Sequence, residues 1–232
     1  MWPAIGRYSL VLAILLATPS DGRGPGTWRG EPVRQAAETT IALPAPVDSS
    51  GVTLKRALEA RRSVRDFAPR RLSQMEISRL LWAVQGVTHP DGLRTAPSAG
   101  ALYPLEVYLS TADGFYRYRP QDHRLVRLRT ADLRAVMQRA AFGQEAIGAA
   151  PAVFVITAVY RRTAVKYGSE RGARYVHIEV GHAAQNLLLE ATALGLGSVP
   201  IGAFNDAELS RALGLPADHE PLYLIPVGEP RQ

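Results

Sequence analysis

The stretch Ala152-Val-Phe-Val-Ile-Thr-Ala-Val159 is an almost unbroken run of apolar and β-branched residues. A strand with one wet face alternates apolar and polar side chains, whereas a strand covered on both faces is apolar throughout. We therefore predict a strand of the fully buried type at 152–159.

Three further strands are predicted before this one. Leu105, Val107 and Leu109 alternate with other residues, as in a half-buried strand. Asp113-Gly114 favours a tight turn into a second strand at Phe115–Tyr118, and Leu125–Leu128 has the pattern of a third. The segment 105–128 is therefore predicted to be an antiparallel meander.

Helices are predicted on either side of these strands. Ser73-Gln74-Met75-Glu76 is a capping box, and the helix it begins is predicted to end at Gly86. Because helices and strands are intermixed without a regular βαβ repeat, we predict an α+β fold. The remaining elements are a helix after Thr53, helices at 130–141, 173–194 and 206–213, and a last strand at 222–227.

The first 51 residues are predicted to precede the folded domain. Arg7 stands before a short apolar run, Leu10 to Ala17, which is typical of a secretory signal over residues 1–20 and too short to span a membrane. Residues 21–51 contain four prolines and no apolar period, so we predict an extended arm. The folded domain is then 52–232. We expect export to the periplasm or beyond, with no stable membrane insertion after cleavage; a later start codon would make the protein cytoplasmic.

Composition excludes several classes of function. The 232 residues are 47% hydrophobic and 21% charged, as in soluble domains, and include no cysteine. Disulfide scaffolds, thiolate metal sites and cysteine nucleophiles are thereby excluded. His177 and His182 lie about 140° apart around a helix, so we expect no metal site. The net charge is +6, and the basic residues are 25 arginines and two lysines against 21 acidic residues. Aromatic residues are not interleaved with these arginines, so we expect no nucleic-acid partner.

Five arginines cluster at 61–71 against one acid, Asp66. The cluster follows the first predicted helix, where the helix dipole favours cations, so a helix cap with surface charge explains it. Arg62-Ser63-Val64-Arg65 suits a phosphate monoester equally well, since two guanidinium groups flank a serine hydroxyl. The residues alone leave both interpretations open.

Two segments of small residues favour close approach of the backbone to a flat ligand. The first is Ala96–Pro104 and the second is Gly195–Phe204. Ser98 suggests a hydrolase nucleophile as an alternative, but the elbow pattern G-x-S-x-G fails because Ala96 stands at its first glycine. The second segment is neither a P-loop nor a dinucleotide-binding turn. Each segment alone is weak evidence.

Taken in this order, the segments resemble the nitroreductase-type flavoprotein family. The match is closest to its SagB-type dehydrogenase branch, which includes the azoline oxidases of peptide natural-product pathways. The resemblance covers about residues 52–230 and also includes the helix pattern at Tyr175–Asn186. It implies an α+β homodimer with a central mixed sheet flanked by helices and a long central helix at the dimer interface.

The resemblance also implies FMN bound between the subunits, with residues from both chains. An arginine-clamped phosphate suits FMN and needs no dinucleotide fold, while the bound cofactor carries the redox chemistry. NAD(P)H is the generic electron donor of the family. The implied phosphate contacts are Arg62, Ser63, Arg65 and Arg231; Ser98, Ala99 and Gly100 would edge the isoalloxazine ring, and Pro200, Ile201, Gly202 and Ala203 would lie at its reactive face.

Lys166-Tyr167 matches a Lys-Tyr pair that the azoline-oxidising branch uses at its active site. Dehydrogenation requires a base for the substrate proton while hydride leaves to the flavin, and a lysine or a tyrosine hydroxyl can serve. The alternative is a surface lysine in a loop. Because lysine is rare in this chain, its presence here favours the catalytic interpretation.

The sequence therefore predicts an FMN-dependent oxidoreductase with ping-pong two-electron chemistry on an unidentified small-molecule or peptide substrate. Two alternatives stay open. A non-catalytic flavin-binding module would bind FMN that neither NAD(P)H nor a substrate reduces. A serine hydrolase using Ser98 would be colourless.

Overall fold

The computed structural model describes residues 38–47 and 51–231. The predicted signal sequence at 1–20 and residues 21–37 and 48–50 of the predicted arm lie outside the described residues. Within the described ranges, no helix combines the length and the apolar character needed to cross a membrane.

Strand β5 (Ala152–Ala158) lies inside the sheet, and all seven of its residues are buried, which confirms the prediction. It pairs antiparallel with β2 (Leu105–Thr111) on one side and β7 (Glu220–Gly228) on the other. Phe154 and Ile156 enter one hydrophobic core, while Val153 and Val155 enter a second core on the opposite face. Two cores explain why the strand has no polar alternation.

Seven strands form one sheet in the order β1-β4-β3-β2-β5-β7-β6. β3 (Gly114–Arg119) and β4 (Arg124–Arg129) complete the predicted meander with β2. β6 (Gly197–Ser198) pairs with β7 at one edge. The expectation of a mixed sheet is corrected: every pair of neighbouring strands in the described chain is antiparallel. The short connections between β2, β3 and β4 allow only this direction.

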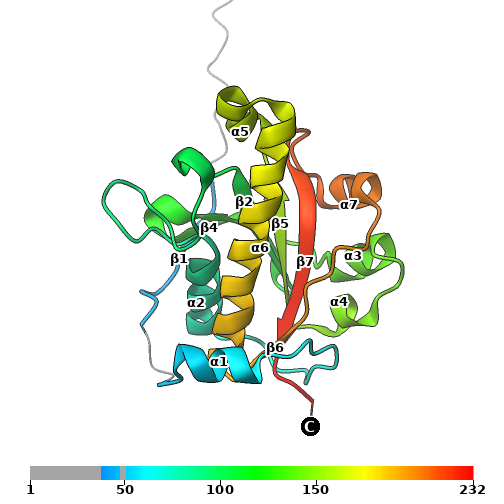
Figure 1. The fold of residues 1–232 in the computed structure, drawn as a ribbon. Helices are drawn as coiled ribbons and strands as arrows, with labels where there is room; N and C mark the ends of the chain where they lie inside the picture. Colours follow the sequence, from blue (N-terminus) through cyan, green and yellow to red (C-terminus); the bar gives the residue numbers. More distant parts are fainter. Residues whose placement is uncertain (1–37, 48–50, 232) are drawn as a thin grey trace, which may run out of the picture. The chain divides into compact units, whose positions relative to one another are not determined.

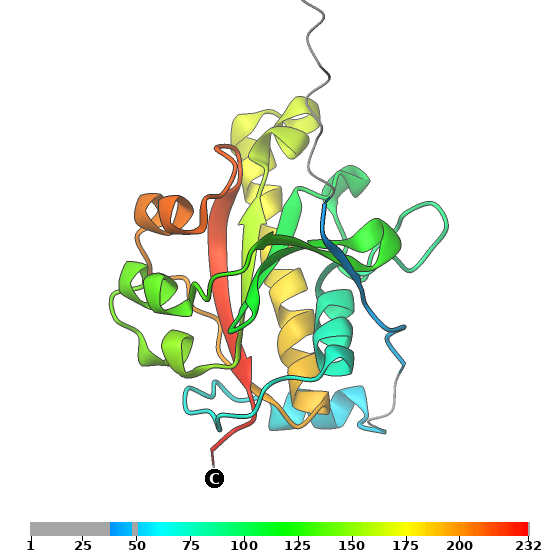
Figure 2. The same ribbon diagram turned by 180° about the vertical axis from the view of Figure 1, so that it is seen from behind.

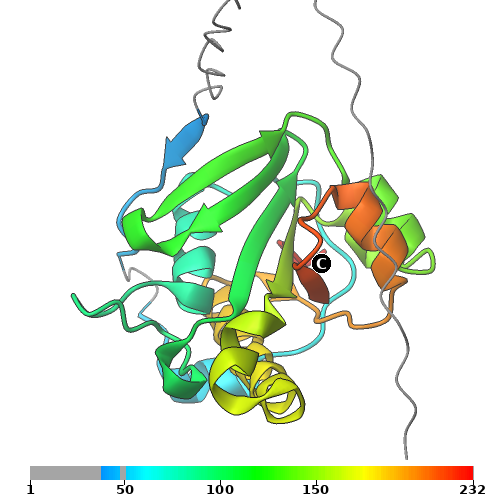
Figure 3. The ribbon, with the colours of Figure 1, turned by 90° about the horizontal axis from the view of Figure 1, so that it is seen from above.

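Helices cover both faces of the sheet (Figure 1, Figure 3). On one face α2 (Gln74–Gln85) and α6 (Ser169–Ala193) pack on the first core, and α1 (Leu54–Ala60) lies beside the end of α6. On the other face α3 (Arg134–Ala140), α4 (Glu145–Ala149) and α7 (Asp206–Leu213) pack on the second core (Figure 2). The three layers confirm an α+β fold with one long central helix.

Local signals located several helix ends correctly. Thr53 caps α1, and Ser73 with Glu76 forms both hydrogen bonds of the capping box of α2. α2 ends before Gly86, and α7 spans the predicted residues.

Two predicted helix starts were wrong. α3 begins at Arg134 rather than Thr130, because the Asp132 carboxylate accepts from the Arg134 N–H and guanidinium and holds a turn ahead of the helix. α6 begins four residues before Ala173. It follows an additional helix, α5 (Tyr160–Tyr167), from which Gly168 separates it with a φ of 77°. Lys166 therefore lies on a helix rather than in a loop.

The segment predicted as an extended arm contributes an edge strand. β1 (Thr40–Ala42) pairs antiparallel with β4, with Ile41 opposite Leu125. The next residue, Leu43, donates its N–H to the His123 carbonyl at 3.2 Å. Ile41 and Leu43 thereby cover part of the first core.

Candidate functional site

The arginine cluster at 61–71 divides into paired and unpaired side chains. Arg70 binds Glu76 and Glu229, and Arg71 binds Asp113 at 2.9 Å. Arg62 and Arg65 are exposed and have no carboxylate partner within residues 38–47 and 51–231. These two guanidinium groups are therefore available to an anion from solvent.

Arg62 also caps the end of α1. Its Nη1 donates to the carbonyls of Glu59 at 2.9 Å and Arg61 at 2.8 Å. The cap occupies one nitrogen of the guanidinium fork and leaves the others without a protein acceptor in the described chain. The two interpretations of the cluster, helix cap and anion contact, are therefore compatible.

The arginine segment lies against the start of the glycine-rich loop. Ser63 forms a parallel bridge with Ser198, and the Val64 N–H donates to the Ser198 carbonyl at 3.0 Å. A Cβ at Gly197 would lie 2.7 Å from the Val64 side chain, so only glycine fits there. Arg231 joins the same cluster, because its Nη2 donates to the Phe67 carbonyl at 3.2 Å.

The rest of the glycine-rich loop runs beside β7. Ile201 is 5% exposed, and its N–H donates to the Leu224 carbonyl at 2.8 Å, so neither its side chain nor its N–H is free. Pro200 is half-buried, while Gly202 and Ala203 are exposed. Of the four residues predicted at the ring's reactive face, Gly202 and Ala203 thus keep an accessible backbone.

The Ser98–Gly100 segment meets the predicted catalytic pair. A Cβ at Gly100 would lie 2.8 Å from the Tyr167 Oη and 3.0 Å from the Lys166 Nζ. The Tyr167 ring makes an edge-on contact with the Tyr175 ring of α6, and the ring centroids lie 4.9 Å apart. Two segments far apart in the sequence are thereby brought to one place.

The turn at 98–103 has an uncommon backbone. Gly100 has a φ of 64°, and two residues with side chains, Ala101 at 53° and Tyr103 at 46°, also have positive φ. Such conformations are disfavoured for residues with a Cβ and gather at functional sites, where the surroundings hold them in place. Here the Ser98 Oγ accepts from the Tyr103 N–H at 2.9 Å and closes the turn.

Beneath this turn lies Glu179 of α6, which is 2% exposed. Its Oε2 accepts from the Ser98 hydroxyl at 2.6 Å, whereas its Oε1 is buried without a hydrogen-bond partner. Burial raises the pKa of Glu179 to about 7, and the hydrogen bond from Ser98, the charge of Arg94 and the Gln85 side chain only partly oppose this. The Glu179 carboxyl thus lies inside the protomer, with one oxygen bonded to Ser98 and the other without a hydrogen-bond partner.

The pKa of Glu179 predicts a pH dependence of stability. Its folded value of about 7 lies above the ordinary 4.5, so the folded state binds the proton more tightly and loses stability as pH rises from 4.5 through 7. We expect the free energy of unfolding of E179Q to rise relative to that of the wild type as pH increases. The difference between the two proteins should be about 3 kcal/mol more favourable to E179Q at pH 8.5 than at pH 4.5. Urea unfolding at the two pH values measures this.

Glu170, exposed on the same helix, gives the matched control. E170Q removes an exposed carboxylate from the same helix, so the difference in its effect between the two pH values should be much smaller than that of E179Q. A pH-independent difference between E179Q and the wild type would contradict the assignment.

Sequence reasoning missed the polar network around Glu179. Arg94 donates to the Gln85 Oε1 at 2.7 Å, and its guanidinium lies 4.4 Å from the centre of the Tyr103 ring. The available signal was a carboxylate within the apolar residues of the longest helix, since acidic residues are rarely buried unless they are paired.

The predicted site residues thus form two separate clusters. The first contains Arg62, Ser63, Arg65, Arg231 and the Gly197–Ala203 loop, near the end of α6. The second contains Ser98–Gly100 with Lys166 and Tyr167, near its start (Figure 1). Within the second cluster, the Ser98 hydroxyl contacts Glu179, which lies 14 residues before the end of α6 at Ala193, about 21 Å along the helix axis.

Comparisons with known proteins show the class of protein to which this fold belongs. The chain matches the Nitroreductase family over residues 58–229 and belongs to that family. It is 44% identical over 195 residues to MJ1384 of Methanocaldococcus jannaschii, a protein named as a nitroreductase; the match covers 82% of this chain and 96% of MJ1384.

Two further relatives refine this placement. The crystal structure of a protein named as a nitroreductase from Ralstonia eutropha is 33% identical, with a TM-score of 0.76 over 83% of this chain and 90% of that one. The microcin B17-processing protein McbC of Escherichia coli is 27% identical over 62% of this chain and 57% of its own length. The chain falls in the SagB-type branch, as its motifs indicate.

Proposed function

We propose that the protein is an FMN-dependent oxidoreductase that transfers two electrons at a time, in ping-pong turnover, on a small-molecule or peptide substrate. One observation carries the proposal: the packing of Gly100 against the Lys166 Nζ and the Tyr167 Oη, at 3.0 and 2.8 Å from the position of an added Cβ. It brings a proton-transferring pair to a backbone turn that a flat ring can approach.

The residues present fit FMN. Arg62 and Arg65, both without a carboxylate partner in the described chain, flank the exposed Ser63 hydroxyl and would hold the phosphate. Gly202 and Ala203 offer exposed backbone for the ring, as does Gly100. The positive φ of Gly100 and its tight contacts mean that a larger residue would fill the space beside Lys166.

Bound FMN would supply the acceptor and donor of hydride. Within this chain, the Lys166 Nζ and the Tyr167 Oη would take a proton from the substrate when it is oxidised and return one when it is reduced. The Tyr175 ring keeps Tyr167 in position, and the hydrogen bonds of Ser98 hold the turn that orients the substrate.

The proposed site requires two copies of the chain. The Arg62–Arg65 segment follows α1, near the end of α6, whereas Lys166 and Tyr167 directly precede its start, so one protomer would supply each part to a site shared with its partner. Exposed apolar side chains support association: Leu54 is 66% exposed, Leu58 54% and Ile178 51%, on α1 and α6. A homodimer would hold two such sites.

The geometry disfavours the hydrolase alternative. The Ser98 hydroxyl donates to a buried carboxylate and accepts a backbone N–H, so it is neither paired with a histidine nor free to attack a substrate. We further propose NAD(P)H as electron donor and an exported location, the latter from the signal sequence predicted at residues 1–20.

The test is the visible spectrum of the purified full-length chain before and after incubation with FMN. We expect flavin absorption that is bleached by NADPH and restored by a quinone acceptor. A protein that stays colourless after reconstitution contradicts the proposal, and labelling of Ser98 by a fluorophosphonate would then favour a hydrolase. Bound FMN that NADPH does not reduce, and that a quinone does not re-oxidise after reduction by dithionite, would indicate a non-catalytic binding module.

A further inference from the structure

A cavity of about 540 Å³ lies between the N-terminal half of α2 and the meander strands. β1 and the residue after it close one side. Its walls are largely apolar and include side chains of the first core that remain only partly covered. The apolar wall consists of Ile41, Leu43, Leu72, Ile77, Leu109 and Leu125.

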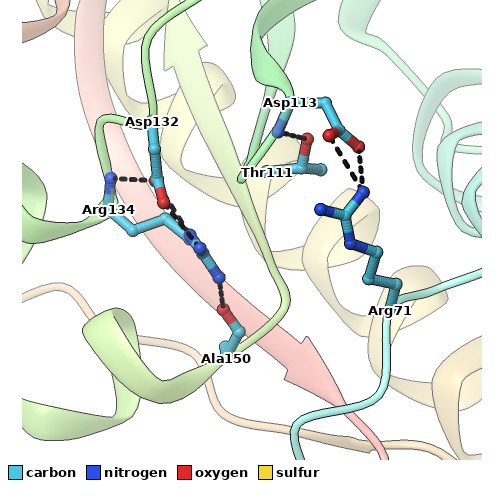
Figure 4. A network of polar contacts seen from close by, with 6 residues as sticks. All are labelled: Arg71, Thr111, Asp113, Asp132, Arg134 and Ala150. Atoms are coloured by element: carbon cyan, nitrogen blue, oxygen red, sulfur yellow. Dashed lines mark hydrogen bonds and ion pairs between the residues drawn. The ribbon is translucent and has the colours of Figure 1, made fainter.

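Charged residues at this cavity are mostly arginines. Three arginines and one aspartate line it, which gives the lining a net charge of +2. Figure 4 shows two of the arginines held by partners: Arg71 binds Asp113 at 2.9 Å, and Arg134 binds Asp132 at 2.6 Å and the Ala150 carbonyl at 2.7 Å. Their charges are thereby compensated within the protein.

The third arginine, Arg127 of β4, has no such compensation. Its Nε is buried and has no hydrogen-bond partner, and the described residues include no carboxylate paired with it. The guanidinium lies 5.6 Å from the centre of the Tyr116 ring, which also lines the cavity. A buried donor without an acceptor is costly, and an anion in the cavity would remove that cost.

We propose that this cavity binds a small carboxylate with an apolar body. The carboxylate would accept from Arg127, and the body would cover the wall formed by Leu43, Ile77 and Leu125. The volume lies within the range of ligand pockets, which are typically apolar with a few convergent polar groups. A neutral apolar ligand would leave Arg127 unpaired, and an inorganic anion would leave the apolar wall open.

This cavity is distinct from the proposed redox site. None of the residues proposed to contact FMN or to transfer protons lines it. It adjoins Thr111 at the end of β2, whereas Tyr103 and the Ser98–Gly100 turn precede the start of that strand, about 20 Å away along seven residues. The proposal is therefore independent of the proposed function.

Calorimetric titration of the full-length protein with octanoate, and with 1-octanol as the uncharged match, tests the proposal. We expect one octanoate site per chain and at least tenfold weaker binding of octanol. R127Q should weaken octanoate at least tenfold and leave octanol unchanged. R124Q is the matched control, because Arg124 lies on the same strand outside the cavity and should not affect octanoate.

A second variant tests the cavity independently, in case R127Q does not fold. A149W adds bulk at an exposed residue that lines the cavity, at the end of α4, and should abolish binding of both ligands. The absence of octanoate binding at millimolar concentration would overturn the proposal. Octanoate affinity that survives either R127Q or A149W would overturn it as well.

Discussion

Replacing Arg62 and Arg65 together by glutamine should yield a protein that folds but loses its FMN. Both guanidinium groups are exposed and without a carboxylate partner in the described chain, so their substitution removes no internal ion pair. A hydrogen bond to a charged group contributes about 1.5–3 kcal/mol, so losing two should weaken FMN affinity at least about 100-fold. Flavin fluorescence titration of the apoprotein measures this.

R71Q is the control for this double variant. Arg71 belongs to the same cluster and is 72% exposed at its side chain, but its guanidinium is bound to Asp113. The loss of one positive charge nearby should therefore leave FMN affinity within about threefold of the wild type. If R71Q and the double variant weaken FMN equally, the cluster acts through bulk charge and does not hold the phosphate.

Replacing Lys166 by alanine should preserve bound FMN and slow turnover about 100-fold. General acid–base groups contribute about 10²–10⁴ to rate, and the Lys166 Nζ lies beside the turn at Gly100, where the substrate is proposed to bind. The readout is anaerobic re-oxidation of dithionite-reduced holoprotein by menadione, followed by stopped-flow absorbance. This half-reaction requires no assumption about the electron donor.

The control is K55A, which removes the only other lysine of the chain. Lys55 is 85% exposed at its side chain and pairs with Glu59 at 3.7 Å on α1, so its loss should not change the rate. Y167F tests whether the neighbouring hydroxyl shares the proton transfer. An unchanged rate in K166A, with Y167F also unchanged, would remove the pair from the proposed mechanism.

Mixing the two variants tests whether the site is shared. In a heterodimer of R62Q/R65Q with K166A, one site combines both defects and the other combines an intact phosphate cluster with an intact Lys166. Activity should therefore reappear after the two inactive proteins exchange subunits. A site contained within one protomer would give no recovery.

The sequence predicts those elements whose signals are local or depend on burial alone. The apolar run at β5 indicates burial on both faces, because a strand with one face in water alternates apolar and polar residues. The capping box at Ser73 and the turn at Asp113-Gly114 depend on neighbouring residues, so they could be read directly.

Elements that depend on distant partners could not be predicted in this way. β1 consists of three residues in a proline-rich segment, and only pairing with β4 makes it a strand. α5 is polar and has no side-chain cap; it packs against α6 across Gly168. Motif order predicted the residues of both clusters, but which of these residues lie together depends on the fold.

Both edges of the sheet consist of its shortest strands, β1 with three residues and β6 with two. Unpaired backbone groups along a long edge invite other chains to add strands, which leads to aggregation. Here the edge at β6 is partly covered as well, because Ser63 and Val64 run beside Ser198. Within the described residues, each edge strand therefore offers few backbone groups to which a further strand could add.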